Sequence, residues 1–470
     1  MNFKRILSNF SYAFISNGLN LLVSVVVALI VPKILGVKEY SYWQLYSFYS
    51  SYVGFFHFGW ADGIYLKFGG KRYEELDKQY FATQFWLLVV MELFITLGIG
   101  FFAWNFGEDY HKSFVITMTG ICCLVKLPCT MLQYLLQTTN RIGAFAKNCM
   151  LERLIYGLIV IGVLMVGVHR YEVLLGADLI AKVCTLLQLC YSCRDIVGKG
   201  IKHVIQGIRE AWENICVGSR LMFANIAGLL LTGIVRFAIE AKWDVEAFGK
   251  VSLTMTVSNL MMVFIGAVSI VIYPVLRNTP KEKLSEIYSL LRSMLMIPLL
   301  GLLMVYYPAK ELLSAWLPQY ADSLRYMALL FPMCIFESKM TMLINTYLKT
   351  LRRERIILAV NWIAVGLTLI LTALTVYVWE SLTLAVVSLT LLLGIRSMMA
   401  ELALCRCLKI HGMKDMIMEF LLALIFVTVS WSVQSWWCMV LYGACFFVYV
   451  MLHLDELKGM AGQIRSYMSD

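Results

Sequence analysis

Charged residues are scarce in this chain of 470 residues. Only 15% of the residues are Asp, Glu, Lys or Arg, whereas 60% are hydrophobic, and the mean hydropathy is +0.75. Soluble domains are typically about half apolar and about a quarter charged. The shortage of charge therefore excludes an ordinary soluble enzyme or binding module and predicts an integral membrane protein.

The sequence motifs of enzymes and molecular motors are also absent. The chain has no GxxxxGK[ST] phosphate loop, no GxSxG nucleophile motif and no HExxH zinc motif. The apolar runs leave only short outer connections, the longest at 309–322. A lipid-linked glycosyltransferase would need a larger outer loop that carries acidic residues. We therefore expect no enzyme, no catalytic residues, no metal site and no cofactor.

What the chain has instead is long apolar runs. A membrane-spanning helix needs ~20 apolar residues, and about fourteen such segments can be drawn. The first run is too long for a cleavable signal peptide. The segments start near Ser11, Ser41, Phe81, Ser113, Cys149, Val173, Ile215, Phe248, Ser289, Ser323, Ile356, Leu382, Ile417 and Trp436.

Basic residues are distributed unequally between the connections. Connections that would lie on one side hold most of the Lys and Arg, including Lys71, Arg141, Arg209 and Arg353. Cytoplasmic loops carry this excess in membrane proteins. We expect both termini in the cytoplasm, and we expect the net charge of +10 to reflect this bias rather than nucleic-acid binding. The other side holds Lys33, Lys38, Lys112, Arg170, Lys242 and Lys310.

Two weak internal echoes predict that the chain consists of two related halves. Residues 14–45 match residues 222–253 at an offset of 208, so that Asn17 falls on Asn225. The stretches that follow the fourth and tenth segments also match, and Pro128 and Pro332 interrupt these two segments. Interrupted helices in corresponding positions are typical of transporters with internal repeats.

These patterns predict an all-α integral membrane protein of about fourteen transmembrane helices, arranged as two pseudo-symmetric six-helix bundles plus two C-terminal helices. The expected division is a first six-helix lobe at 1–195, a linker at 196–214, a second lobe at 215–408, and two extra helices with a cytoplasmic tail at 409–470. The linker places Ile205, Ile208 and Trp212 on one helical face. We expect it to lie on the inner leaflet, the alternative being a solvated linker.

Charged and polar side chains within the apolar segments are the candidate functional residues. Each is costly in lipid and must face a cavity, a partner or the interface. The candidates for lining a substrate cavity are Asn17, Asn20, Lys126, Arg220, Asn225, Lys339 and Arg396. The candidates for ion coupling or for structural pairs are Asp62, Asp178, Lys182 and Glu337.

Several of these residues also fit a purely structural role. Asp178 and Lys182 lie one helical turn apart, in the order that favours a mutually neutralised pair. A structural role is harder to assign to Lys126, Arg220, Lys339 and Arg396, because the only acid nearby on the same helix face is Glu337 for Lys339. The polar stripe that contains Asn17 and Asn20 could join helices or line a wet cavity.

Three stretches resemble one family of membrane transporters. They are Leu35-Gly36-Val37-Lys38-Glu39-Tyr40, the run from Phe58 to Lys71, and the segment from Gln133 to Asn148. Together with the overall layout, they are similar to the multidrug/oligosaccharidyl-lipid/polysaccharide exporter superfamily, whose fold is called MATE-like. The resemblance is greatest to its Wzx-type polysaccharide flippases for O-antigen and capsule repeat units.

This resemblance implies a flippase for an undecaprenyl-pyrophosphate-linked oligosaccharide in the bacterial plasma membrane. The partners it implies are the polyprenyl-pyrophosphate-linked glycan, membrane lipid, a polysaccharide polymerase and a chain-length regulator, with no nucleic acid. Cations in a cavity between the halves would offset desolvation of the pyrophosphate. Transport could be coupled to an H⁺ or Na⁺ gradient, and the residues do not select the ion.

Two other functions stay open at this point. A cation-coupled multidrug exporter of the same fold would need a cavity dominated by acids, whereas most cavity candidates here are basic. A membrane-embedded glycosyltransferase or ligase is disfavoured by the short outer loops.

Overall fold

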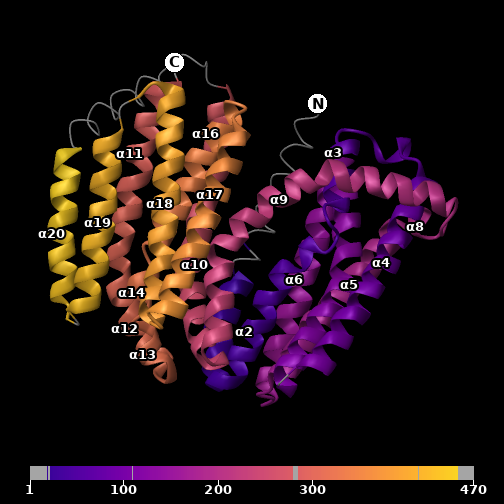
Figure 1. The fold of residues 1–470 in the computed structure, drawn as a ribbon, viewed down its shortest axis with the longest axis horizontal. Helices are drawn as coiled ribbons and strands as arrows, with labels where there is room; N and C mark the ends of the chain where they lie inside the picture. The colour runs from indigo at the N-terminus through magenta and orange to yellow at the C-terminus, as the bar shows by residue number, and fades with distance from the viewer. Residues whose placement is uncertain are drawn as a thin grey trace. The chain divides into compact units, whose positions relative to one another are not determined.

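The computed structural model describes residue 18 and residues 22–107, 109–278, 284–410, 412–433 and 435–453. In these residues the secondary structure is helical, without strands (Figure 1). Within the described part of the chain, ten helices are long and apolar enough to cross a membrane, and the shorter helices Leu22–Ile34 and Trp437–Leu452 are also apolar. The expected all-α membrane fold is confirmed.

The chain divides into two compact units, Met1–Ile226 and Ala227–Asp470. The boundary falls inside helix α9 (Val204–Lys242), which is continuous over its whole length. We expected a separate linker helix that ends near residue 214. The structure differs in this respect because no proline interrupts the sequence between Val204 and Lys242, so helical hydrogen bonding continues from the polar part into the apolar part.

Helix α5 is the central helix of the first unit, where it packs against α2, α3, α4, α6 and α7. Asp77 caps α4 and Asp109 caps α5 by accepting hydrogen bonds from backbone N–H groups in the first turn. Besides Leu22–Ile34, the helices of this unit are α2 (Val37–Tyr52), α3 (Trp60–Phe68), α4 (Lys78–Phe106), α5 (Tyr110–Thr138), α6 (Ile142–Met165), α7 (Tyr171–Ser192), α8 (Arg194–Val197) and the start of α9.

A sharp break separates α2 from α3, because Phe58 and Gly59 have φ values of 53° and 87°. The break lets the backbones of α3 and α9 meet directly. A Cβ atom on Gly63 would lie 1.9 Å from the carbonyl oxygen of Asn214, and one on Gly218 would lie 2.0 Å from that of Gly59. Small residues permit such close helix contacts in membranes. These glycines are therefore required by packing.

The central element of the second unit is the span Met327–Thr350, whose apolar part is almost entirely buried. It consists of α14 (Met327–Leu330), α15 (Met333–Ser338), the π-helical segment Lys339–Ile344 and α16 (Asn345–Thr350). Pro332, which lacks an N–H donor, lies between α14 and α15. The two segments that echo each other in sequence are thus the central helices of their own units.

The other helices of the second unit surround this span. Among them, α10, α11 and α18 pack against α15. The other helices of this unit are the end of α9, α10 (Val245–Asn278), α11 (Leu284–Leu302), α12 (Tyr306–Trp316), α13 (Ala321–Leu324), α17 (Glu354–Thr372) with a π-helical continuation (Ala373–Val378), α18 (Leu382–Leu408), α19 (Met413–Ser432) and α20 (Trp437–Leu452).

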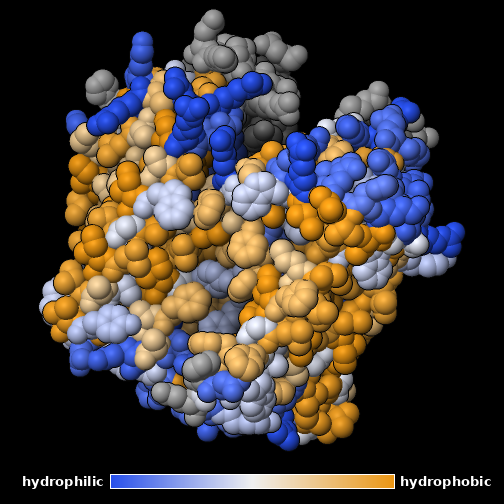
Figure 2. Space-filling view, turned by 45° about the vertical axis from the view of Figure 1, so that its right-hand side comes forward, coloured by the Kyte–Doolittle hydropathy of each residue, from blue (hydrophilic) through white to orange (hydrophobic). Residues whose placement is uncertain are grey.

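On the face drawn in Figure 2, hydrophobic residues cover most of the middle of the surface, and hydrophilic residues gather towards the top and the bottom of the view. Large apolar side chains such as Phe94, Leu158 and Ile363 are more than half exposed. In water this surface would be very unfavourable, whereas lipid tails solvate it. The surface pattern supports the membrane assignment.

The polar start of α9 has three distinct faces. Gly207 and Ala211 are buried against the first unit, and Ile205 and Trp212 are 87% and 66% exposed. The polar residues Gln206, Arg209 and Glu213 take the third face. An exposed apolar face beside a charged one is typical of a helix at a membrane interface.

Candidate functional site

The first unit neutralises one of its buried cations internally. Asp178 and Lys182 of α7 form an ion pair one turn apart, and the hydroxyl of Tyr46 on α2 donates to Asp178 Oδ2 over 2.6 Å. Lys182 is buried, and Asp178 is only partly exposed. Asp178 thus contacts Lys182 on its own helix and Tyr46 on α2, and this polar cluster joins α2 to α7.

Lys126 on α5 lacks such an acid. It is half-buried, and its Nζ atom donates only a long 3.4 Å hydrogen bond to the backbone oxygen of Ser50. No carboxylate of the described residues forms an ion pair with it. A cation in this setting can accept an anionic ligand without first breaking a salt bridge.

Glu92 on α4 is the reverse case, a fully buried acid without a cationic partner. The Cys123 thiol on α5 donates to its Oε2 atom over 3.1 Å, and its Oε1 atom has no hydrogen-bond partner among the described residues. A buried carboxylate without a cation is costly. The sequence does show an acid inside an apolar run, but Glu92 was not among the predicted site residues.

Asp62 on α3 is also buried, and its carboxylate lies 3.8 Å from His57 Nε2. The other ring nitrogen of His57 accepts a 3.0 Å hydrogen bond from the backbone N–H of Gly59. His57 lies before the break at Phe58 and Gly59 and Asp62 lies after it, so the pair holds the geometry of the break.

Among the described residues, the most extensive set of ion pairs is a buried charge network in the second unit. Arg292 of α11 contacts Glu401 of α18 at 2.7 Å, Glu419 of α19 at 2.8 Å and Asp415 of α19 at 3.0 Å. Lys339 pairs with the same two glutamates, at 2.6 Å from Glu419. We call Arg292, Lys339, Glu401 and Glu419 the charge network.

Besides Asp415, two tyrosines contact the charge network. Tyr288 donates to Glu401 over 2.9 Å, and Tyr449 of α20 lies 3.4 Å from Glu419. All four charged members are buried. The network joins α11, α18, α19 and the central span, so the two last helices are bound electrostatically to the rest of the unit.

The structure corrects the expected surroundings of Lys339. Glu337 does not neutralise it, because residues two positions apart on a helix point in different directions. Glu337 instead pairs with Arg396 of α18 at 2.9 Å, and Arg396 Nε donates to Asn361 Oδ1 over 2.9 Å. Both predicted cations thus have acidic partners on neighbouring helices.

Two further candidates lie on α9, where Arg220 and Asn225 are exposed. The guanidinium of Arg220 forms no ion pair or hydrogen bond with the described residues. Asn17 and Asn20 lie outside the described residues. Among the predicted cations, Lys126 and Arg220 are therefore the two whose charge is not offset by a described acid.

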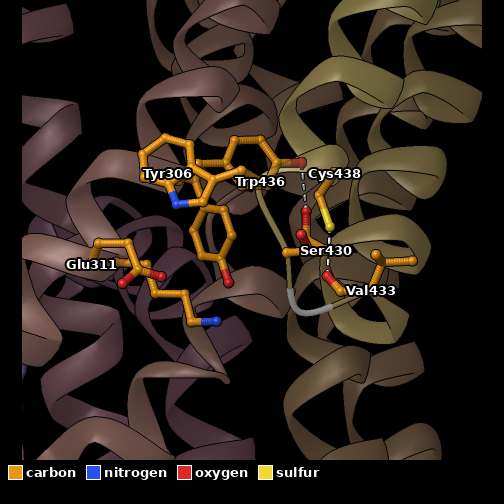
Figure 3. A pocket seen from close by; sticks show the side chains of 9 residues that line it. Tyr306, Glu311, Ser430, Val433, Trp436 and Cys438 are labelled. Atoms are coloured by element: carbon orange, nitrogen blue, oxygen red, sulfur yellow. Dashed lines mark hydrogen bonds between the residues drawn. The ribbon is translucent and has the colours of Figure 1, made fainter.

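One small cavity, of about 60 Å³, lies between α12 and the turn that joins α19 to α20. Tyr306, Glu311 and Trp436 line it, and Cys438 donates to the backbone oxygen of Val433 at its edge (Figure 3). It has room for about two water molecules. A cavity of this size does not bind a substrate.

Comparison with known proteins identifies the fold. No protein-family model and no curated protein matches the chain. Among solved structures, the lipid II flippase MurJ in an inward closed conformation is 12% identical, with a TM-score of 0.64 over 96% of this chain and 100% of MurJ. An inward-facing multidrug resistance MATE family transporter of the MOP superfamily is 14% identical, with a TM-score of 0.57 over 84% of this chain and 94% of that chain. The chain has the MATE-like fold that these two transporters share.

Proposed function

We propose that this protein is a flippase that moves an undecaprenyl-pyrophosphate-linked oligosaccharide from the inner to the outer leaflet of the bacterial plasma membrane by alternating access. The oligosaccharide would be a repeat unit of O-antigen, capsule or exopolysaccharide. Both termini would lie in the cytoplasm. A polysaccharide polymerase and a chain-length regulator would act after translocation.

The observation that carries the proposal is the extent of the likeness to the lipid II flippase. That match covers 96% of this chain, whereas the multidrug transporter match covers 84%. That protein is named as a flippase of lipid II, a lipid-linked substrate. A lipid-linked head group is therefore a better candidate substrate than a free organic cation.

The cations Lys126 and Arg220, which have no acidic partner among the described residues, also favour an anionic substrate. Lys126 and Arg220 keep their charge available, whereas Lys339 and Arg396 have acidic partners. Arg can bind phosphate oxygens through two parallel hydrogen bonds, and Lys contributes a point charge. In this proposal Lys126 and Arg220 contact the pyrophosphate. Asn225, five positions after Arg220 and on another face of α9, contacts a different part of the substrate.

Ion coupling is a separate part of the proposal. Asp62, Asp178 and Glu337 are acids within the apolar segments, and each lies near a basic or imidazole group that could compete with a bound H⁺ or Na⁺. Of the three, Glu337 is the most accessible, because its side chain is 31% exposed, whereas those of Asp178 and Asp62 are 20% and 6% exposed.

The proposal is tested with purified protein in vesicles that contain a fluorescent undecaprenyl-pyrophosphate-linked oligosaccharide. Dithionite destroys the fluorescence of head groups in the outer leaflet, so flipping appears as a larger accessible fraction. We expect Lys126→Met and Arg220→Gln each to slow flipping at least tenfold, because each removes a charge-assisted contact.

Two matched controls separate a binding role from a general effect of charge. Lys349→Met and Arg406→Gln remove exposed cations at helix ends that have no described partner. Both should flip the substrate at the rate of the unchanged protein. Wild-type flipping in Lys126→Met and Arg220→Gln would refute their role, and efflux of cationic dyes without any flipping would favour the multidrug exporter instead.

A further inference from the structure

A larger cavity lies at one end of the second unit, with a volume of about 470 Å³. Small-molecule sites usually enclose about 300–1,000 Å³. The cavity lies where α10 and α18 begin, beside α13 and the end of α19. We call it the end pocket. Its lining includes Asp244, Glu246, Lys250, Asp322, Arg325 and Trp431.

The end pocket is distinct from the charge network. Thr383 lines the pocket at the start of α18, and Glu401 belongs to the network 18 positions later on the same helix. At 1.5 Å per residue the two positions are ~27 Å apart along the helix axis. Ligand binding in the pocket therefore does not require the charge network to open.

One wall of the pocket is a rigid aromatic surface. The guanidinium carbon of Arg325 lies 4.2 Å from the ring centroid of Trp431, and its Nη2 atom donates to the backbone oxygen of Trp431 over 3.2 Å. The ring of Tyr326 lies 5.7 Å from that of Trp431. The Nε atom of Arg325 is buried and has no partner among the described residues.

The remaining charged groups of the pocket are available to a ligand. Asp322 is exposed and Glu246 is half-buried, and neither forms an ion pair or hydrogen bond with the described residues. Asp244 already caps the start of α10 through a 2.7 Å hydrogen bond from Ala247. Lys250 supplies a further donor. The pocket thus offers acceptors and donors side by side.

We propose that the end pocket binds a neutral saccharide. A hydroxyl group both donates and accepts, so neighbouring hydroxyls can satisfy the carboxylates and the cationic donors together. A phosphate would meet three carboxylates, and a polyamine would meet Lys250 and Arg325. The aromatic wall suits the apolar face of a sugar ring. Binding of a free saccharide is measured without transport, so its result is independent of the proposed function.

The test is saturation-transfer NMR on the full chain in phospholipid nanodiscs, because maltoside detergents would themselves supply a sugar. The probes are lactose and N,N′-diacetylchitobiose, with spermidine and inorganic phosphate as charged alternatives. We expect transfer to at least one disaccharide. Its Kd should rise roughly tenfold in the double variant Asp322→Asn/Glu246→Gln, which loses two charge-assisted acceptors.

The control is Glu354→Gln, which removes an exposed acid at the start of α17, outside the pocket. It should bind the disaccharide like the unchanged protein. Thermal unfolding of all variants should coincide, because the replaced carboxylates have no described partners. Absence of transfer to both disaccharides, equal Kd values in the double variant, or transfer to spermidine or phosphate alone would overturn the proposal.

Discussion

The Nη2 atom of Arg292 lies 2.8 Å from Oε1 of Glu419, which joins α11 to α19 inside the second unit. Lys339 contacts the same carboxylate through its other oxygen at 2.6 Å. Two cations therefore share the buried Glu419, and both also contact Glu401. Removing one partner from a buried ion network leaves an uncompensated charge, whereas removing charges in balance does not.

Glu419→Gln should destabilise the protein by ~3–5 kcal/mol, because Arg292 and Lys339 would then share one fewer negative charge in a buried site. The measurement is thermal unfolding of the purified protein. The double variant Lys339→Met/Glu419→Leu should recover most of this loss, because it removes one charge of each sign. A single variant as stable as the unchanged protein would contradict the described network.

Gly63→Ala should separate α3 from α9, because the added Cβ atom would overlap the carbonyl oxygen of Asn214. We expect a loss of ~1–3 kcal/mol, which is typical of overpacking. Gly54→Ala is the matched control, since no atom lies within 4 Å of its Cβ position. Equal unfolding temperatures for the two variants would show that the backbones do not meet as described.

Glu92→Met should leave the stability unchanged or raise it by about 1 kcal/mol. The carboxyl group has only the Cys123 thiol as a partner, so an apolar side chain of similar length removes an expensive buried group. Unfolding and vesicle flipping are measured on the same preparation. A stable variant that no longer flips would identify Glu92 as a coupling residue, and a loss above ~2 kcal/mol would contradict this prediction.

A spin label at Ile208 should contact lipid, because Ile208 lies on the exposed apolar face at the start of α9. A label at Gln206, on the polar face of the same helix, should contact water. The measurement compares collisions with oxygen, which is enriched in lipid, and with a water-soluble nickel complex. Equal accessibility at both positions would exclude an interfacial orientation.

The apolar runs are long enough to predict most of the fold from sequence. Each helix satisfies its own backbone hydrogen bonds, so composition and length specify a spanning segment without knowledge of its neighbours. The predicted starts at Phe81, Leu382 and Trp436 lie within a few residues of the observed starts of α4, α18 and α20. Local patterns also indicated the contact between Asp178 and Lys182, which are one turn apart.

The sequence by itself therefore determined the helices, their order and the presence of costly charges inside them. Tertiary structure alone decided which charges are neutralised. Lys339 pairs with Glu419, 80 positions later, and Arg396 pairs with Glu337, 59 positions earlier. Such partners depend on which helix faces meet, and every apolar helix face has similar chemistry. The packing of the helices, rather than local spacing, therefore selects each ion pair.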